Sequence, residues 1–536
     1  MSPLRVITEK LGGSALARAA LEEKTPVTWY RRRPDSASAW RDHMATVRRR
    51  FASSNWLSAL LPALRPEGAA RERLDRVSDG AGVLITTGQQ AGLFGGPIYT
   101  WSKAVSALAM ADSLEASTGI PTAPVFWAAT DDADFAEASI THVSVAGGLE
   151  TLRLPEPAQL GVSMRDTPLG DVTDLVRALG HGAGSATYSA ILEQVASVYE
   201  PRATVGSAYV ELLRAVLEPL GITVLDAGHP SVREAARPLL INALRESRAI
   251  QDALERRQQE ILAGGFEEQV QLVRGLSLVF ESGVKGRERV SIQSSLEVAA
   301  KESAALGSTA LIRPLLEQAL LPTASYVAGP AEIAYFAQTG AVADAIGVDR
   351  PMVLPRWACC IIEPHIDRLL SRYGFAREEL ANPHSAETRI ARDALPAAIG
   401  AGLVGLTENM RASVDALRDA FRKEQAKLDV SPAVADGFQR DVQRRIVRLD
   451  RRIVAAAKRS QLDARRDIAT MRAALYPLGK PQERVLNLIP LLARHGPALL
   501  SAMLDRAREH ASDLIPGSRG ESGSLSSAGE VSATPS

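Results

Sequence analysis

The stretch LITTGQQAGLFGGPIYTWSK, residues Leu84–Lys103, decides the fold. A short apolar, β-branched run ends in two threonines, and glycines then recur through the turn at Gly88, Gly92, Gly95 and Gly96. Pro97 stands where a helix is expected to begin, a position at which its fixed φ and missing N–H cost little. A strand, a glycine-rich loop and a helix N-terminus together form an arrangement that binds anions through free backbone N–H groups. A tight glycine turn without a ligand is the alternative for this segment taken alone.

Strands and helices alternate along the chain from residue 82 onward. Val83–Thr86 and Ala123–Ala129 predict buried strands, with a helix over 98–115 between them. Ile222–Asp226 predicts a further strand, followed by a helix from about Ser231, and Val353–Pro355 predicts another. Continuous apolar strands of this kind are typical of parallel sheets that are covered on both faces. The order therefore predicts a doubly wound α/β core.

Composition is that of an ordinary globular protein. The 536 residues are enough for about two to four structural units. Lys plus Arg and Asp plus Glu both number 62, which disfavours nucleic acid and acidic membranes as partners. The two cysteines, Cys359 and Cys360, are adjacent in an apolar run and are interpreted as buried structural thiols. The sequence shows no apolar run of membrane-spanning length and no signal-peptide core, so we expect a cytoplasmic protein without a membrane partner.

Two insertions interrupt the alternating pattern. Val143–Leu154 predicts a hairpin about Gly147-Gly148, and residues 250–305 contain a second hairpin in which LSLVF and RVSIQ flank a turn at Gly283–Gly286. The predicted units are a Rossmann-like core with N-terminal helices over 1–142, a first insertion over 143–205, core segments over 206–249 and 306–383, a second insertion over 250–305, a helical hairpin over 384–475, a C-terminal helical segment over 476–515 and a disordered Gly/Ser-rich tail over 516–536.

Long helices are expected between about 400 and 475. Apolar residues recur there at steps of three and four, at Met410, Val414, Leu417, Phe421, Leu428 and, after a break, Val442, Ile446, Leu449, Ile453 and Ala456. Ser431 before Pro432 is a favourable start for the second helix. This spacing predicts an antiparallel coiled coil. The basic side chains over 439–467 could bind a phosphate-rich partner, but a solvated face beside a more acidic helix is the more common explanation.

Carboxylates crowd the strand end in WAATDDADFAEASITH, Trp127–His142. Asp131, Asp132 and Asp134 follow the strand directly, and open α/β sheets bind ligands at the carboxyl ends of their strands. Like charges this close destabilise one another unless a substrate amine, another cation or a metal offsets them. We therefore interpret these residues as candidate catalytic groups. A solvated acidic loop, in which an aspartate caps the next helix, explains the segment equally well.

Two further segments place cations on stiff backbone. Arg313 begins RPLLEQALLPTASYVAGPAEIAYF, Arg356 follows Pro355, and each guanidinium suits a phosphate or carboxylate, with surface salt bridges as the alternative. Gly329 opens a predicted helix that carries Glu332. Familiar motifs do not account for these residues. The stretch GAGLVG at Gly400–Gly405 matches GxGxxG formally, but no strand precedes it. The sequence also lacks GxxxxGK[ST], HEXXH, GxSxG and paired CxxC motifs.

Taken together, the segments resemble the BshC family, the cysteine ligases of bacillithiol biosynthesis. The matching stretches are TTGQQAGLFGGPIYTWSK, PVFWAATDDADFAE, RPLLEQALLPTASYVAGPAEIAYF, LPRWACCIIEPHI and PQERVLNLIPLLARHG at 481–496. The resemblance implies an α/β fold with a Rossmann-like parallel-sheet core, inserted connecting-peptide regions and a C-terminal antiparallel coiled coil that makes a homodimer. It also implies that L-cysteine is joined to the amine of glucosaminyl malate. The sequence departs from the family's usual Glu-Asp-His-Asp-Phe at Ala133, where the histidine is missing, and Ala331 replaces a glycine.

The resemblance and the chemistry of amide formation lead to expected roles. A free carboxylate is a poor electrophile, so ATP is expected as a co-substrate that activates it, and no metal is expected. Asp132, Asp134 and Asp131 are the expected catalytic residues, which would hold the substrate amine or take its proton. The expected substrate- and nucleotide-binding residues are Thr87, Gly88, Gln89, Gln90, Gly92, Gly95, Lys103, Arg313, Gly329, Glu332 and Arg356. Two alternatives stay open: a catalytically impaired relative that only binds a nucleotide or sugar-acid ligand, and a scaffold or nucleic-acid partner.

Overall fold

The computed structural model describes residues 4–79, 81–283, 286–382, 384–424, 427, 431 and 433–517. The chain divides into two compact units, which are considered separately. The larger unit comprises Val6–Val143, Thr151–Ile361 and Glu483–Ser536. The smaller comprises Met1–Arg5, Ser144–Glu150 and Ile362–Gln482. The residues of 518–536, most of the predicted disordered tail, lie outside the described residues.

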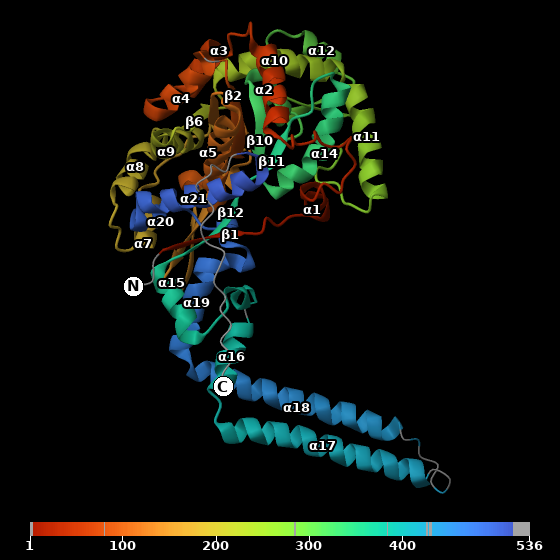
Figure 1. Ribbon diagram of the computed structural model, residues 1–536. Helices are drawn as coiled ribbons and strands as arrows, with labels where there is room; N and C mark the ends of the chain where they lie inside the picture. The colour runs from red at the N-terminus through yellow and green to blue at the C-terminus, as the bar shows by residue number, and fades with distance from the viewer. Residues whose placement is uncertain are drawn as a thin grey trace, which may run out of the picture. The chain divides into compact units, whose positions relative to one another are not determined.

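A five-stranded parallel sheet forms the centre of the larger unit (Figure 1). Its spatial order is β11 (Val353–Pro355), β10 (Thr323–Ala328), β2 (Val83–Gln90), β3 (Thr122–Ala129) and β6 (Thr223–Asp226). Numbered by their order along the chain, these strands run 3-2-1-4-5 from β6 to β11, the arrangement of a Rossmann fold. The predicted strands and the doubly wound core are confirmed.

Helices bury the sheet because its strands are apolar on both faces. Every residue of β3 and β10 is buried. Helices α3 (Trp56–Leu64) and α4 (Gly68–Asp79) share one hydrophobic cluster with the odd-numbered residues of β3, Ala123 through Ala129. Helix α5 (Ile98–Thr118) packs against β2 and β3, and α21 (Pro497–Leu514) packs against α5. Pro97 is the N-cap of α5, one residue before the helix begins.

The remaining helices of the larger unit include the two that the sequence predicts from about Ser231 and after Gly329. They are α1 (Ala15–Leu21), α2 (Ala37–Phe51), α6 (Phe135–Ala138), α7 (Thr173–Ala183), α8 (Ala190–Val198), α9 (Val205–Leu217), α10 (Pro230–Arg245), α11 (Ser247–Ala263), α12 (Ser295–Ala300), α13 (Arg313–Leu320), α14 (Pro330–Ala345) and α20 (Ile489–His495). Helix α14 begins directly after Gly329, as the sequence predicts.

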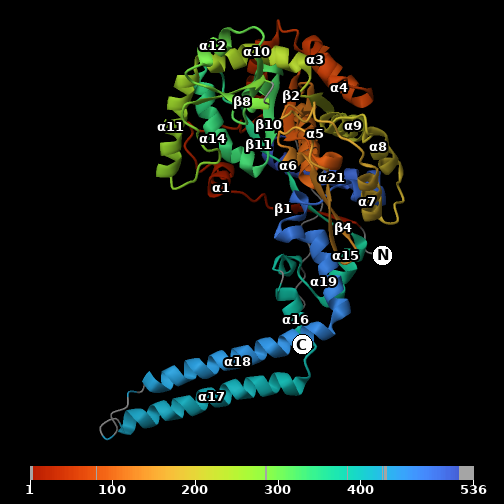
Figure 2. The ribbon, with the colours of Figure 1, turned by 180° about the vertical axis from the view of Figure 1, so that it is seen from behind.

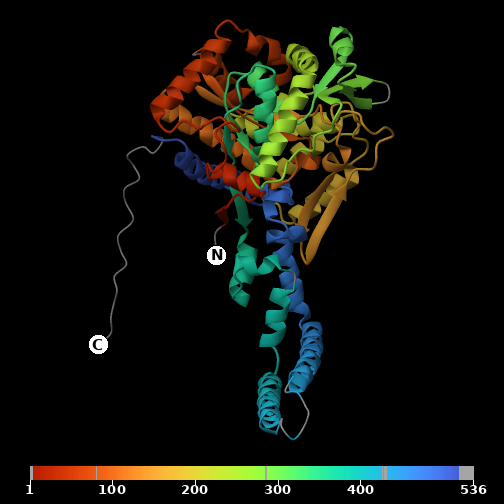
Figure 3. The same ribbon diagram turned by 90° about the vertical axis from the view of Figure 1, so that its right-hand side faces the viewer.

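Both insertions contain the predicted hairpins, as Figure 3 shows. Strands β4 (Ile140–Val145) and β5 (Gly148–Arg153) form the first. Strands β7 (Leu276–Gly283) and β8 (Gly286–Ser291) form the second, and β9 (Ala305–Ser308) extends it to three strands. The N-terminal segment, for which helices and irregular structure are expected, also contains a strand, β1 (Arg5–Glu9), which pairs with the distant strand β12 (Ala358–Ile362). Cys359 and Cys360 lie buried in β12.

The smaller unit is helical. It contains α15 (Pro364–Tyr373), α16 (Ser385–Asp393), α17 (Ala397–Glu424), α18 (Ala433–Ser460) and α19 (Leu462–Leu475). Helices α17 and α18 lie side by side as the predicted hairpin, which Figure 2 shows from behind. The hairpin is shorter than the predicted 384–475, since α16 and α19 are separate helices. The GAGLVG stretch lies within α17 and forms no phosphate-binding loop. The break at Asp429-Val430 and Pro432 lies outside the described residues, whereas the Ser431 hydroxyl accepts a hydrogen bond from the Ala433 N–H at 3.3 Å.

Within the described part of the chain, no single helix is long and apolar enough to cross a membrane. Helices α16 and α17 reach that composition only when taken together, across a bend of 106°.

Candidate active site

The candidate active site lies where β2 and β10 end side by side. The next core strand along the chain, β3, pairs with one edge of β2. Strand β10, which comes much later in the chain, pairs with the other edge of β2. Such a switch in strand order opens a crevice at the carboxyl ends, where ligands of open α/β sheets bind. Gln89 and Gln90 end β2, and Gly329 follows β10. The elements that bring side chains to this edge are α5, α13, α14 and the acidic segment after β3.

Lys103 and Glu332 form a buried ion pair at the switch point. The Lys103 Nζ atom lies 2.5 Å from Glu332 Oε2, and the two side chains are 3% and 17% exposed. Nζ also donates to the Gly88 carbonyl at 2.6 Å and to Gln89 Oε1 at 3.1 Å. Burial lowers the pKa of Lys103, against the opposing effect of Glu332. The ammonium is therefore held by three acceptors in a site from which bulk water is excluded.

Glu332 is fixed from its own side as well. Its Oε2 accepts a hydrogen bond from the Gly329 N–H at 2.6 Å, and its Oε1 accepts one from the Tyr326 hydroxyl at 2.6 Å. The first contact closes the N-terminus of α14, since Glu332 is at the third helical position. The sequence thus positions this carboxylate through a helix start, and the strand β10 supplies the tyrosine.

Asp132 is the centre of a second charged group. Its Oδ2 accepts from Gln90 Nε2 at 2.8 Å and from Arg313 Nη2 at 3.2 Å. Its Oδ1 accepts from the N–H groups of Ala133 at 2.7 Å and Asp134 at 3.2 Å. Burial acts to raise the pKa of Asp132, but Arg313 and the hydrogen bond from Gln90 outweigh it, so the pKa is lowered. Asp132 is therefore an anion at neutral pH.

The other two aspartates occupy different surroundings. The Arg287 Nη1 atom donates to the Asp131 carbonyl at 2.9 Å, and the buried Asp131 Oδ1 has no hydrogen-bond partner among the described residues. Asp134 is exposed, and its Oδ1 accepts from the Glu137 N–H at 3.1 Å as the N-cap of α6. For Asp134 the structure therefore supports the alternative of a helix-capping aspartate, and its catalytic role stays a prediction.

A cavity of about 240 Å³ opens beside Asp131, at the ends of β3 and β6. Its lining includes Trp127, Ser163 and Gly228 from the core and first insertion, Arg287 from the second insertion, and Ser308 at the end of β9. A Cβ at Gly228 would lie 2.7 Å from the Thr130 hydroxyl oxygen, so the cavity wall requires glycine there. The volume suits a small metabolite and is below the usual range for larger ligands.

Other segments of the same chain pack against the glycine loop and form hydrogen bonds with it. A Cβ at Gly92 would lie 2.8 Å from the Gly96 Cα, and one at Gly95 would lie 2.4 Å from the Trp101 ring. Asn487 Nδ2 donates to the carbonyls of this loop, at 2.9 Å to that of Phe94 and 3.2 Å to that of Gly96. The Ile98 N–H, at the start of α5, donates to the Leu486 carbonyl at 2.9 Å. The C-terminal segment therefore takes up several hydrogen-bonding groups of this loop, and a phosphate-binding role of Gly92 and Gly95 stays a prediction.

Comparison with known proteins agrees with this architecture. A family model for the bacillithiol biosynthesis BshC N-terminal Rossmann-like domain matches residues 5–357, and one for the BshC C-terminal coiled-coil domain matches 359–513. The chain belongs to the BshC family. Relatives named "Putative cysteine ligase BshC" include one from Solibacter usitatus, 31% identical over 84% of this chain and 87% of the relative. Those from Heliobacterium modesticaldum and Koribacter versatilis are 29% and 28% identical, over 82% and 93% of this chain and 84% and 96% of their own lengths.

Three of the expected BshC binding residues make contacts within the protein. The Thr87 hydroxyl donates to the Val327 carbonyl at 2.8 Å and so ties β2 to β10. Arg356 forms a buried bidentate pair with Glu483, at 2.5 Å to Oε1 and 2.8 Å to Oε2. Its guanidinium is thus paired within the protein, as Arg313 and Lys103 are, and a role of Arg356 in ligand binding stays a prediction. Gly88, within β2, would place a Cβ 2.9 Å from the Trp127 carbonyl and is required for strand pairing.

The structure also reveals residues that sequence reasoning missed in this BshC crevice. Glu317 is 1% exposed, and neither carboxylate oxygen has a hydrogen-bond partner among the described residues. Burial raises its pKa to about 8, against the opposing effect of Arg313. The signal was its place four residues after Arg313 in RPLLEQ, on the same face of α13. Glu483 and Asn487 had no such signal, because their partners are far away in the sequence. Among the described residues, no group of three or more His, Cys, Asp or Glu could hold a metal ion.

Proposed function

We propose that this chain forms an amide bond between L-cysteine and the amine of glucosaminyl malate. The observation that carries the proposal is the meeting of Asp132 with Arg313, and of Lys103 with Glu332, at the switch point of a BshC-family Rossmann sheet. The names of the relatives support a cysteine ligase, and the cavity beside Asp131 accommodates a molecule of metabolite size.

The reaction needs an activated carboxyl group. We propose ATP as the co-substrate, which converts the cysteine carboxylate to an acyl adenylate or acyl phosphate and releases pyrophosphate or ADP. The amine nitrogen of the acceptor then attacks the acyl carbon, and the bond to the phosphate oxygen breaks as the amide forms. One proton leaves the nitrogen in this step and must be accepted by a base.

The charged groups of the crevice fit these demands. Arg313 and Lys103 are buried cations, and buried cations stabilise charge that develops on transferring phosphate and acyl oxygens. Asp132 is an anion at neutral pH and suits the role of holding a substrate ammonium or accepting its proton. Gln90 and Arg313 fix the orientation of this carboxylate.

A second candidate function is a BshC-like protein that only binds a nucleotide or sugar-acid ligand. Ala133 favours it, since a methyl side chain cannot transfer a proton at the position where the family resemblance leads us to expect histidine. The backbone N–H of Ala133 still orients Asp132, so a ligand amine could be held without catalysis.

The test is product formation by the purified chain. Cysteine, glucosaminyl malate and ATP are incubated with the wild type and with Ala133→His, and the thiol product is measured by mass spectrometry, with each substrate omitted in turn. Product that requires all three substrates supports the ligase. A large gain in rate from Ala133→His would show that the natural chain is impaired. No product from either protein would overturn the ligase proposal and favour binding alone.

We also propose that the hairpin of α17 and α18 pairs with a second copy of the chain. It exposes large apolar side chains on both helices, among them Leu406, Leu417, Phe438 and Leu449. Apolar side chains at coiled-coil spacing that are exposed in one chain are stabilised when a partner helix covers them. We place the protein in the cytoplasm, where ATP and free cysteine are supplied.

A further inference from the structure

Backbone contacts from the first insertion hold the acidic segment after β3. The Met164 N–H donates to the Asp132 carbonyl at 2.8 Å, and the Arg165 N–H donates to the Thr130 carbonyl at 2.9 Å. The Arg165 side chain also pairs with Asp226 at the end of β6. The carbonyl between these two is left for another part of the chain.

Arg287, in β8, binds this remaining carbonyl. Its Nη1 donates to the Asp131 carbonyl at 2.9 Å, and its Nη2 lies 4.0 Å from Asp131 Oδ2. Nη2 also donates to the Ser308 carbonyl at the end of β9, at 2.6 Å. The guanidinium carbon lies 4.3 Å from the centre of the Phe280 ring in β7. One side chain therefore joins the sheet of β7, β8 and β9 to the acidic segment.

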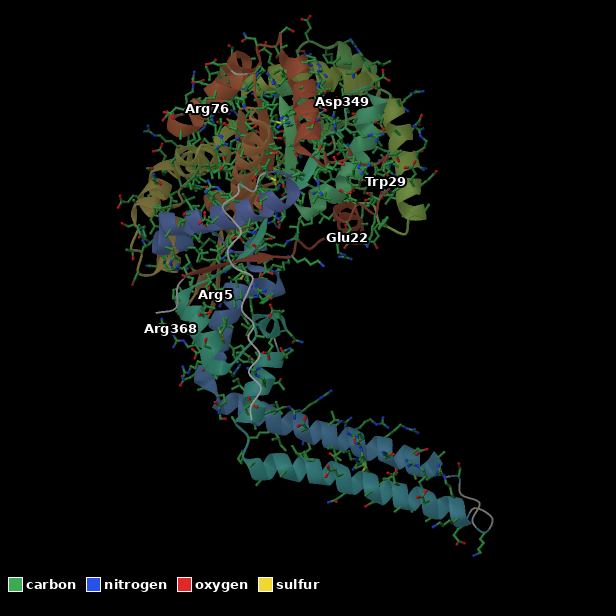
Figure 4. All side chains as sticks on the ribbon, in the orientation of Figure 1. Arg5, Glu22, Trp29, Arg76, Asp349 and Arg368 are labelled. Carbon is green, nitrogen blue, oxygen red and sulfur yellow. The ribbon has the colours of Figure 1, made fainter. Side chains whose placement is uncertain are left out.

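Strand β9 leaves room for this guanidinium. A Cβ at Gly307 would lie 3.1 Å from Arg287 Nη2 and 3.3 Å from its Nε, so a side chain there would displace the guanidinium. Side chains fill the interior of the larger unit, as Figure 4 shows, and the Arg287 side chain is only 12% exposed. A planar guanidinium that is enclosed in this way and bonded at both terminal nitrogens is fixed in its orientation.

Arg287 also acts on the charge of Asp132. The charged groups around this carboxylate are Arg313, Arg287, Asp131, Asp134 and Glu137. Burial acts to raise the pKa of Asp132, and the positive charges of Arg313 and Arg287 lower it. Arg287 thus contributes both to the place of the acidic segment and to the ionised state of its central carboxylate.

We propose that Arg287 is a positioning residue, which holds the acidic segment at the sheet edge and so orients the Asp132 carboxylate for the reaction. The kinetic part of this inference rests on the proposed ligase function. The Asp132 carboxylate accepts hydrogen bonds from the N–H groups of its own segment, so it moves when that backbone moves. A displacement of about 1 Å in a reacting group can lower a rate about a hundredfold.

The kinetic test compares Arg287→Met and Arg287→Lys with the wild type. Methionine keeps an apolar contact with Phe280 but removes the charge and both hydrogen bonds, so kcat should fall at least about tenfold. The acid limb of the kcat/KM profile should move to higher pH, because Asp132 loses a nearby positive charge. Lysine keeps the charge but lacks the planar fork. It should therefore restore the position of the acid limb but only part of kcat.

The matched control is Arg289→Met. Arg289 lies in the same strand, and its Nε donates to the Ser277 carbonyl of β7 at 2.9 Å. Within the part of the chain that the structure describes, it forms no hydrogen bond or ion pair with the acidic segment. Arg289→Met should leave kcat and the acid limb unchanged. Thermal unfolding identifies any variant that fails to fold, and Arg287→Lys carries the test if Arg287→Met is one of them.

Hydrogen–deuterium exchange measures the hold on the segment without any substrate. The N–H groups of Met164 and Arg165, which bond to its carbonyls, should exchange faster in Arg287→Met than in the wild type or in Arg289→Met. Equal exchange in all three proteins would overturn the proposal.

Arg287 also lines the cavity beside Asp131, so a direct contact with substrate is the alternative role. A loss that lies wholly in KM, with an unmoved acid limb, would show that role and overturn positioning. Faster exchange in Arg287→Met, in a chain whose wild type forms no product, would support the hold on the segment and overturn the ligase function alone.

Discussion

Lys103 Nζ lies 2.5 Å from Glu332 Oε2 at the point where β2 and β10 end. The lysine comes from α5 and the glutamate from the first turn of α14, so the pair joins the two helices that flank the switch in strand order. The ion pair is thus a structural support of the sheet and a charged group of the crevice at once. The two roles can be separated by measurement.

Lys103→Met should lower the free energy of unfolding by about 3–5 kcal/mol, because it leaves the Glu332 carboxylate buried without its cation. The double variant Lys103→Met with Glu332→Gln should recover much of that stability but no ligase activity. Denaturant unfolding and product formation are the two measurements. Recovery of both stability and activity in the double variant would contradict a role in the reaction.

Asp132→Asn and Asp134→Asn should behave differently. Asp132 is buried and paired with Arg313, so its loss should lower kcat/KM by about a hundredfold or more. Asp134 is an exposed N-cap, and asparagine caps helices equally well, so its substitution should cost less than tenfold. Steady-state kinetics of both variants measure the two losses in kcat/KM. Equal and large losses would instead support a catalytic role for Asp134.

Gly95→Val should destabilise the fold and not merely weaken ligand binding. The residue has a φ of +83° and its Cβ would lie 2.4 Å from the Trp101 ring, so we expect a loss of about 2 kcal/mol or more. Gly180→Ala is the control, since nothing lies within 4 Å of its Cβ within α7. Thermal unfolding should show the first variant lowered and the second equal to or above the wild type. An unchanged Gly95→Val protein would refute the packing role.

Glu317 should make stability depend on pH. Its pKa is raised to about 8 in the folded chain from an ordinary value of 4.5, so the folded state binds the extra proton in that window. Stability from this group is therefore complete below pH 4.5 and is lost as pH rises toward 8, at about 1.4 kcal/mol per pH unit at most. Glu317→Gln should remove this loss, so that its advantage over the wild type grows from pH 5 to pH 8. A constant difference in unfolding free energy across that range would contradict the prediction.

The chain should be a dimer at micromolar concentration. Leu417→Asp places a charge among the exposed apolar side chains of the hairpin and should yield a monomer. Asp419→Asn, nearby in the same helix, should leave the dimer intact. Light scattering measures both, and a monomeric wild type would refute the pairing of chains.

Local patterns predicted most of the fold because the core strands are short, apolar and bounded by turn residues. β2, β3, β6 and β11 were predicted from their own sequences, as were the hairpins of both insertions. Strand β1 was not, since only its pairing with β12 makes residues 5–9 a strand. Its sequence RVITE carries no sign of a partner more than three hundred residues away.

The sequence pointed to residues that lie together in the structure, but it did not reveal the internal contacts that some of them make. The structure brings Gln89, Gln90, Lys103, Asp132, Arg313, Gly329 and Glu332 to one sheet edge. Arg356 forms a buried ion pair with Glu483, and no local sequence motif links these two residues. Roles that depend on a distant partner need the tertiary structure, whereas helix starts and strand ends do not.

The contacts of Asn487 and Glu483 also bear on the order of synthesis. Three carbonyls of the glycine loop after β2 accept hydrogen bonds from Asn487. The buried Arg356 guanidinium donates hydrogen bonds to both carboxylate oxygens of Glu483. A nascent chain that ends before these residues would bury a cation and loop carbonyls without partners. We therefore expect the sheet that begins at residue 83 to complete its folding only after nearly the whole chain has left the ribosome. Products truncated before residue 483 are thus expected to be targets for chaperones and proteases.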